Sequence, residues 1–187
     1  MFEPGSWLHK PVKTVIDLID EYKNQDYLNV LDLESGIGKV VCVDLLESAI
    51  DKLKSYSQKL GIEQYIETRL SDIEDFKIEN EEYDIIVSVS AMEHVSSQRA
   101  LENKLKEMTL GTKTNGSNCI IIGSNIREVI IDNGQELDPM FEVNISTECM
   151  MEILDHHYAG WEVNKRFVKQ LEYEIDRNGE PVKLTTD

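Results

Sequence analysis

Short apolar runs alternate with longer amphipathic stretches over most of this chain. Residues 28–33, 39–45 and 83–90 are continuous apolar runs, typical of strands buried on both faces of a sheet. Residues 64–70 alternate in the manner of a more exposed strand, and residues 118–123 predict a further strand. Since helical stretches separate these runs, the pattern predicts an α/β fold with a Rossmann-like, doubly wound and mostly parallel sheet.

Four stretches have the spacing of amphipathic helices: residues 11–24, 47–60, about 97–110 and about 147–158. Pro11 suits a first helical turn, and Gly61 suits the end of the second helix. Residues 112–117, Thr-Lys-Thr-Asn-Gly-Ser, have the composition of a turn ahead of the strand at 118.

The last third of the chain predicts an antiparallel hairpin. Residues 161–176 alternate as one long strand, and Asp176-Arg177-Asn178-Gly179 predicts a turn into a strand at 181–186. Pairing outward from that turn sets 171–176 against 182–187. Residues 161–170 would then lack a hairpin partner, and because unpaired backbone groups are costly, the end of the last strand is expected to be missing.

The composition fits one soluble globular domain. The 187 residues are 41% hydrophobic and 29% charged, enough for a single α/β core. We expect a single domain with an N-terminal helical segment (1–27), a core (28–125) and a C-terminal helix and hairpin (126–187). No internal repeat or low-complexity linker divides it.

The net charge and the cysteine pattern limit the kinds of partner that the protein is expected to bind. With 19 basic and 36 acidic residues the net charge is −17, which repels nucleic acid. No window approaches the roughly 18 apolar residues of a membrane span, and no secretory pattern begins the chain, so we expect no membrane association and a cytoplasmic protein.

Cys42, Cys119 and Cys149 have neither a disulfide nor a zinc pattern. His156-His157 predicts an exposed helical pair. No metal is therefore expected.

A glycine-containing turn with acids on both sides separates the first two strand candidates. Asp32 ends the first strand, Gly36 and Gly38 follow, and Asp44 ends the second, where it can accept hydrogen bonds from ribose hydroxyls. Yet only residues 34–38 separate the runs, whereas parallel neighbours need a crossover of about a dozen residues. A first crossover helix is therefore expected to be missing, through an unusual connection or through absent residues.

These features resemble the class I S-adenosylmethionine-dependent methyltransferases, nearest to the small bacterial enzymes of the tellurite-resistance type. The resemblance covers about residues 28–125. Asp32 and the run Glu34-Ser35-Gly36-Ile37-Gly38 match the family's acid and glycine turn, Asp44 its ribose-binding acid, and Asp72 the acid that receives the adenine amino group. The resemblance implies S-adenosylmethionine as cofactor, with these binding residues: Asp32, Glu34, Gly36, Gly38, Asp44, Leu45, Asp72, Ile73 and Ser88. A dinucleotide site fits less well, because it needs a glycine at Val41.

The same resemblance implies methyl transfer to a small molecule or a metalloid species. The fourth strand and Ser88 to His94 line the transfer site in the family, and His94 is a candidate base or substrate-orienting residue. Glu34 departs from the pattern, since it adds a carboxylate where the cofactor's own carboxylate lies. The alternative is a catalytically silent remnant that acts as a binding or assembly module. A homodimer is compatible with either reading.

Overall fold

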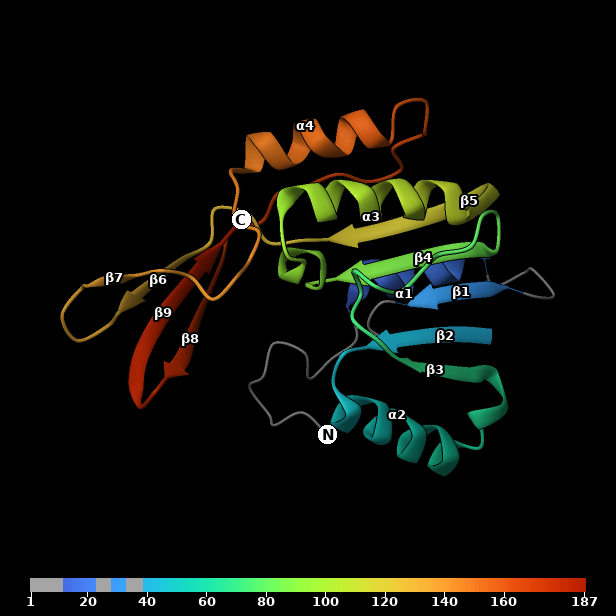
Figure 1. The fold of residues 1–187 in the computed structure, drawn as a ribbon, viewed down its shortest axis with the longest axis horizontal. Coiled ribbons are helices and arrows are strands. Elements are labelled where there is room, and N and C mark those ends of the chain that lie inside the picture. Colours follow the sequence, from blue (N-terminus) through green and yellow to red (C-terminus); the bar gives the residue numbers. More distant parts are fainter. Residues whose placement is uncertain (1–11, 23–27, 33–38) are drawn as a thin grey trace. The chain divides into compact units, whose positions relative to one another are not determined.

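The computed structural model describes residues 12–22, 28–32 and 39–187 (Figure 1). The chain divides into two compact units. Met1–Val89 and Leu110–Ile120 form the first unit, and Ser90–Thr109 and Ile121–Asp187 form the second.

The first unit contains a five-stranded sheet in the order β3-β2-β1-β4-β5. Its strands are β1 (Asn29–Asp32), β2 (Lys39–Asp44), β3 (Ile66–Leu70), β4 (Tyr83–Val89) and β5 (Thr112–Ile121). The pairs β1–β2, β1–β4 and β2–β3 are parallel, and the arrow of β5 points the same way in Figure 1. The predicted Rossmann-like, mostly parallel sheet is therefore confirmed.

The first two strands are direct neighbours in this sheet. Asn29 pairs with Lys39 and Asp32 with Cys42, so β1 and β2 run side by side in parallel. Only residues 33–38 connect them, and these lie outside the described residues. This is shorter than the dozen or so residues of an ordinary crossover helix, as the sequence predicts.

The core of the first unit is formed by the central strands. Leu31, Ile85 and Ile86 are fully buried, and Val30 and Val40 are nearly so. Because neighbouring residues of a strand point to opposite faces, this burial confirms strands that are covered on both sides. Cys42 and Cys119 are buried, as expected for core residues.

The helices begin and end close to their predicted positions. They are α1 (Lys13–Tyr22), α2 (Glu47–Leu60), α3 (Gln98–Gly111) and α4 (Thr147–His157), with 3₁₀ turns η1 (Glu63–Tyr65) and η2 (Met92–His94). Gly61 ends α2 with a left-handed φ of 67°, which glycine adopts without strain. Ser146 caps α4 by accepting the backbone N–H of Cys149 at 3.2 Å. No helix in the described part of the chain combines the length and apolar character that a membrane span requires.

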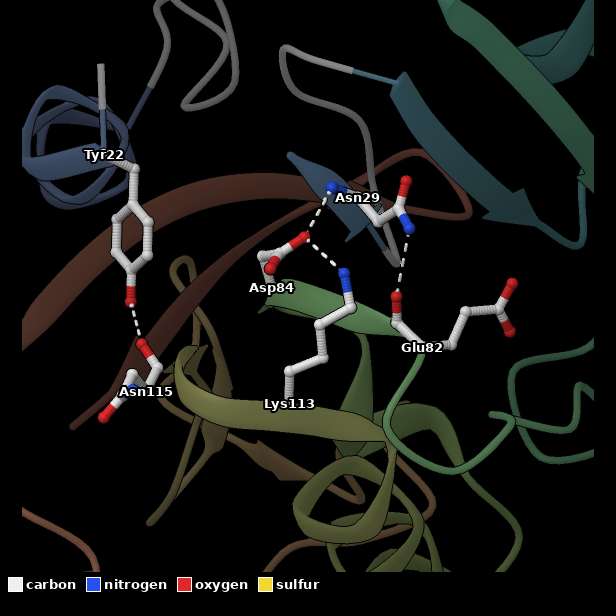
Figure 2. A network of polar contacts seen from close by, with 6 residues as sticks. All are labelled: Tyr22, Asn29, Glu82, Asp84, Lys113 and Asn115. Atoms are coloured by element: carbon white, nitrogen blue, oxygen red, sulfur yellow. Dashed lines mark hydrogen bonds and ion pairs between the residues drawn. The ribbon is translucent and has the colours of Figure 1, made fainter. Parts of the chain in front are cut away.

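Polar contacts join the strands at the amino edge of the sheet (Figure 2). Oδ2 of Asp84 accepts the backbone N–H of Asn29 at 2.8 Å and Nζ of Lys113 at 2.8 Å. The hydroxyl of Tyr22 in α1 donates to the carbonyl oxygen of Asn115 at 3.1 Å. These contacts attach the starts of β1, β4 and β5 to one another, at the edge opposite the predicted site.

The strand β5 starts earlier than predicted. The turn expected at 112–117 is wrong, because Thr112 already begins the strand directly after α3. Asn115 has a φ of 67°, so the turn-forming residues produce an irregularity inside the strand. Gly116 packs so closely that an added Cβ would lie 2.6 Å from the carbonyl oxygen of Asp84.

The second unit contains a separate antiparallel sheet in the order β7-β6-β9-β8. Its strands are β6 (Arg127–Ile130), β7 (Glu136–Leu137), β8 (Leu171–Arg177) and β9 (Glu180–Thr186). The predicted hairpin is confirmed, but its register is one residue off: Leu171 pairs with Thr186. Asn178 (φ 59°) and Gly179 (φ 87°) form a two-residue loop, which makes Arg177 and Glu180 the closing pair.

The long strand predicted at 161–176 is only partly present. Residues 161–170 are described without strand structure, and β8 begins at Leu171. A strand forms where its backbone groups find a ladder, and the pairing of β8 with β9 covers only residues 171–177. The opposite side of β9 pairs with β6, a strand that the sequence did not predict.

Candidate active site

The predicted acids lie together at the carboxyl edge of the parallel sheet. Asp32 ends β1, Asp44 ends β2, and Asp72 follows the end of β3 at Leu70. The register sets Asp44 beside Leu70, and Asp32 beside the residue that precedes Ser88 in β4. Four of the predicted site residues therefore lie at one edge, where open α/β sheets bind their ligands.

Two of these acids are held by short loops. The backbone N–H of Leu46 donates to Oδ1 of Asp44 at 2.7 Å, and that of Glu74 donates to Oδ1 of Asp72 at 2.8 Å. The backbone N–H of Ser71 also donates to the carbonyl oxygen of Asp44 at 3.1 Å, which joins the two loops. The second carboxylate oxygen of Asp44 and of Asp72 has no partner among the described residues. Each acid is thus fixed at one oxygen and offers the other to a hydroxyl or amino donor.

Two further polar residues of this edge are buried. Asp32 is 2% exposed and Ser88 is fully buried. Oγ of Ser88 has no hydrogen-bond partner in the described part of the chain. A buried hydroxyl without a partner is unfavourable and uncommon, so this atom fits a site that a polar ligand completes.

Exposed apolar residues lie next to the two held acids in the sequence and in the strand register. Leu45, Leu46 and Leu70 are 65%, 62% and 57% exposed, although they are large and apolar. The predicted residue Ile73 is partly buried in the loop after β3. Exposed apolar surface beside carboxylate acceptors suits a nucleoside, which combines a flat base with hydroxyl and amino groups.

The glycine turn of the predicted site, with Glu34, Gly36 and Gly38, lies outside the described residues. Their roles toward the cofactor therefore remain predictions from the sequence.

His94 belongs to the second unit and follows β4 shortly along the chain. It is the last residue of η2, and its side chain is 48% exposed. Nδ1 of His94 lies 3.3 Å from Oε2 of Glu142, and the imidazole stacks on the ring of Phe141 with centroids 5.0 Å apart. Sequence reasoning missed Glu142 and Phe141, because nothing in the pattern links them to a residue so distant in the chain.

Glu93 is a second residue that the sequence did not single out. It is 3% exposed, and Oε2 has no hydrogen-bond partner among the described residues. Burial raises the pKa of the Glu93 carboxyl, and hydrogen bonds from the backbone of Glu93 and Gly123 oppose this only in part. Glu93, which lies between the buried Met92 and the exposed His94, therefore favours its protonated, neutral form more than a free glutamate does.

Metal-binding residues do not gather in the described chain. The residues at 12–22, 28–32 and 39–187 contain no group of three His, Cys, Asp or Glu placed to hold an ion. His156 and His157 have ring centroids 5.2 Å apart in an edge-to-face arrangement. The described site is therefore one of carboxylates, a serine and apolar residues.

Comparison with known proteins gives one family match and several similar folds. The family described as "Methyltransferase domain" matches residues 28–116. Among solved structures, the chain is similar to TehB from Haemophilus influenzae, with 22% identity and a TM-score of 0.59 over 91% of this chain and 60% of that one. YcgJ from Bacillus subtilis has 12% identity and a TM-score of 0.60, over 93% and 94% of the two chains. A SAM-dependent methyltransferase from Methanosarcina mazei has 11% identity and a TM-score of 0.53, over 90% and 94%.

The matches differ in how much of each protein they cover. The chain spans only 60% of the length of TehB, and no curated protein matches the sequence. The Rossmann-like fold that the resemblance implies is confirmed by these structures. Residues 28–116 match the family described as "Methyltransferase domain", and the chain has the fold of the S-adenosylmethionine-dependent methyltransferases.

Proposed function

We propose that this chain transfers the methyl group of S-adenosylmethionine to a small molecule or a metalloid species. The observation that carries the proposal is the pair of acids at neighbouring strand ends, Asp44 and Asp72, each held at one oxygen by a backbone N–H. A nucleoside cofactor offers hydroxyl donors on its ribose and an amino donor on its base, and ligands of open α/β sheets bind at this edge. The family match over residues 28–116 supports the same activity.

The residues suggest a division of roles. Asp44 accepts the ribose hydroxyls, Asp72 accepts the adenine amino group, and Leu45 and Ile73 cover the faces of the base. When bound, S-adenosylmethionine supplies a methyl group on a positively charged sulfur, which keeps the C–S bonding electrons when the methyl group leaves. Asp32 and the buried hydroxyl of Ser88 then complete the edge with polar groups beside the cofactor.

The reaction demands little acid–base machinery. A displacement of this kind depends on alignment of acceptor, methyl carbon and leaving sulfur, and on exclusion of water. His94 is our candidate for the residue that contacts the acceptor. Glu34, in place of the family's first glycine, is expected to weaken cofactor binding through like-charge repulsion.

Isothermal titration calorimetry with S-adenosylmethionine tests the cofactor site. We expect binding by the wild-type protein and an affinity about tenfold lower for Asp72→Asn, because the amide keeps the loop contact but lacks the charge. Asp51→Asn, at an exposed position of α2, is the matched control and should bind like wild type. Absence of binding at millimolar cofactor would contradict the proposal.

Formation of S-adenosylhomocysteine with candidate acceptors tests turnover. A silent binding module would bind the cofactor without forming product, and the match of residues 28–116 to a methyltransferase domain argues against this alternative. We also propose a cytoplasmic location and soluble small-molecule substrates, which the net charge of −17 supports by disfavouring nucleic acids. A solution mass tests the possible homodimer.

A further inference from the structure

An open cavity in the first unit lies near the amino ends of the parallel strands. Its volume is about 330 Å³, at the small end of the range of about 300–1,000 Å³ that is usual for ligand sites. Val41 of β2 and Glu67 of β3 are register partners, so their side chains leave the same face of the sheet, where both line the cavity. Among the described residues of the lining, none is one that we assign to the cofactor.

The hydroxyl of Tyr83 faces this cavity. Tyr83 begins β4 and lines the cavity, and only 4% of the residue is exposed. Burial, followed by the charges of Glu82 and Glu67, raises the pKa of Tyr83 to about 12. Both acids line the same cavity, so the hydroxyl is directed toward it. It stays protonated at neutral pH and has no hydrogen-bond partner among the described residues, which leaves it open to a ligand.

The cavity carries more negative than positive charge. Its described lining includes the acids Glu67, Glu79 and Glu82 and the bases Arg69 and Lys77. Arg69 forms an ion pair with Glu67, whereas Glu79 and Glu82 have no ion-pair partner in the described part of the chain. At the buried hydroxyl the three carboxylates outweigh the opposing charge of Arg69. The interior of the cavity therefore favours a cation.

The backbone of Glu82 is fixed on both sides. Its N–H donates to the carbonyl oxygen of Gly111 at 3.0 Å, and its carbonyl oxygen accepts Nδ2 of Asn29 at 3.2 Å. Figure 2 shows that its carboxylate points away from the contact between Asp84 and Lys113. The fixed backbone keeps this carboxylate at the cavity while its oxygens stay available, which lowers the entropic cost of binding a ligand.

The lining suits ammonium groups better than a metal ion. The described residues contain no group of three acids, histidines or cysteines placed to hold an ion. Phe76 and Tyr83 add aromatic rings, which attract organic cations, to carboxylates that accept N–H groups. Two unpaired carboxylates match two ammonium groups, and the small volume limits the length of the chain between them.

We propose that this cavity binds a small aliphatic diamine, whose ammonium groups donate hydrogen bonds to the carboxylates of Glu79 and Glu82 and to the hydroxyl of Tyr83. The site is separate from the cofactor edge, where Asp44 ends β2 and Asp72 follows β3. Binding of the diamine does not depend on methyl transfer, because it uses none of the residues that we assign to the cofactor.

Isothermal titration calorimetry at constant ionic strength tests the site, with putrescine as the probe. We expect one saturable site in wild type and an affinity about tenfold lower in Tyr83→Phe, which loses the hydroxyl but keeps the net charge. Glu82→Gln should also lose about tenfold. Glu81→Gln is the matched control, because this neighbouring acid is also exposed but lies outside the lining, and it should bind like wild type.

Equal losses in Glu81→Gln and Glu82→Gln would show non-specific attraction to an acidic chain and overturn the proposal. An unchanged affinity in Tyr83→Phe would overturn it as well. If Tyr83→Phe does not fold, the comparison of the two exposed acids decides.

Further probes test the chemistry of the ligand. Butylamine, with one ammonium group, should bind about tenfold more weakly than putrescine, and tetramethylammonium, without N–H donors, more weakly still. Magnesium chloride or tetramethylammonium bound as tightly as putrescine would contradict the diamine. Saturating S-adenosylhomocysteine should leave the affinity for putrescine unchanged, whereas displacement of putrescine would place the diamine at the cofactor edge and overturn the proposal.

Discussion

The backbone N–H of Leu46 donates to Oδ1 of Asp44 at 2.7 Å, so the acid that ends β2 is fixed by the loop that follows it. This contact leaves Oδ2 for the ribose hydroxyls that we propose Asp44 binds. Asp44→Asn keeps an oxygen for Leu46 but turns the free acceptor into a donor. We expect its affinity for S-adenosylmethionine to fall by at least tenfold, measured by calorimetry, with an unchanged melting temperature. An unchanged affinity would remove Asp44 from the site.

The buried acid of η2 predicts a pH dependence of stability. Burial raises the pKa of Glu93 above its ordinary value of 4.5, so the folded chain binds this proton more tightly than the unfolded chain. The contribution of the Glu93 carboxyl to the free energy of unfolding is therefore fully present below about pH 4.5 and is lost as the pH rises toward the pKa of the folded state. In Glu93→Gln this contribution no longer changes with pH, because the amide does not titrate. The melting temperature of the variant, relative to wild type, should increase from pH 4.5 to pH 7; a constant difference would contradict the prediction.

The antiparallel sheet contains a buried ion pair whose loss should be costly. Glu128 is 1% exposed, and its Oε2 lies 2.6 Å from Nη1 of Arg177. Arg177→Leu leaves this carboxylate buried without its cation, so the free energy of unfolding should fall by about 3 kcal/mol in urea denaturation. Arg127→Leu is the control, because its pair with Glu136 is exposed to solvent and should contribute much less to stability. Equal losses in the two variants would refute the argument.

The hairpin between β8 and β9 depends on a left-handed glycine. Gly179 has a φ of 87°, and an added Cβ would meet no atom within 4 Å, so only the backbone conformation opposes a side chain. Gly179→Ala should reduce the free energy of unfolding by about 1 kcal/mol. Gly179→Asn should lose less, because asparagine tolerates this region better. The comparison is read from urea denaturation of the two variants, and an Asn variant less stable than the Ala variant would count against it.

The amino edge of the parallel sheet should govern stability and leave cofactor binding unchanged. Asp84 accepts hydrogen bonds from Asn29 and Lys113, both at 2.8 Å (Figure 2). Asp84→Asn weakens both contacts and should lower the free energy of unfolding by about 1–2 kcal/mol. Its affinity for S-adenosylmethionine, measured by calorimetry, should match wild type, since the predicted site lies at the other edge. A tenfold loss of affinity would show that the two edges are coupled.

Local patterns in the sequence were sufficient for much of the parallel sheet. Continuous apolar runs identify strands such as β4 (Tyr83–Val89), because a strand buried on both faces has no polar side. The acids Asp32, Asp44 and Asp72 could be assigned to one edge from strand order alone, since parallel strands present their carboxyl ends together.

Other features depend on partners that lie far along the chain. Residues 161–170 alternate like a strand, yet the β8–β9 ladder begins only at Leu171. The hairpin register was set by the φ values of Asn178 and Gly179, which allow a loop one residue tighter than the pattern suggested. Strand pairing and register are properties of the ladder, so composition alone leaves them open.

The sequence by itself determined the α/β class, the parallel order of the first strands and the acids that end them, because periodicity, strand order and residue chemistry are local. The tertiary structure decided that Asp44 and Asp72 are each held at one oxygen, that Ser88 is buried without a partner, and that Glu142 meets His94. Those contacts arise only when the backbone fixes distances between residues that no periodic pattern connects.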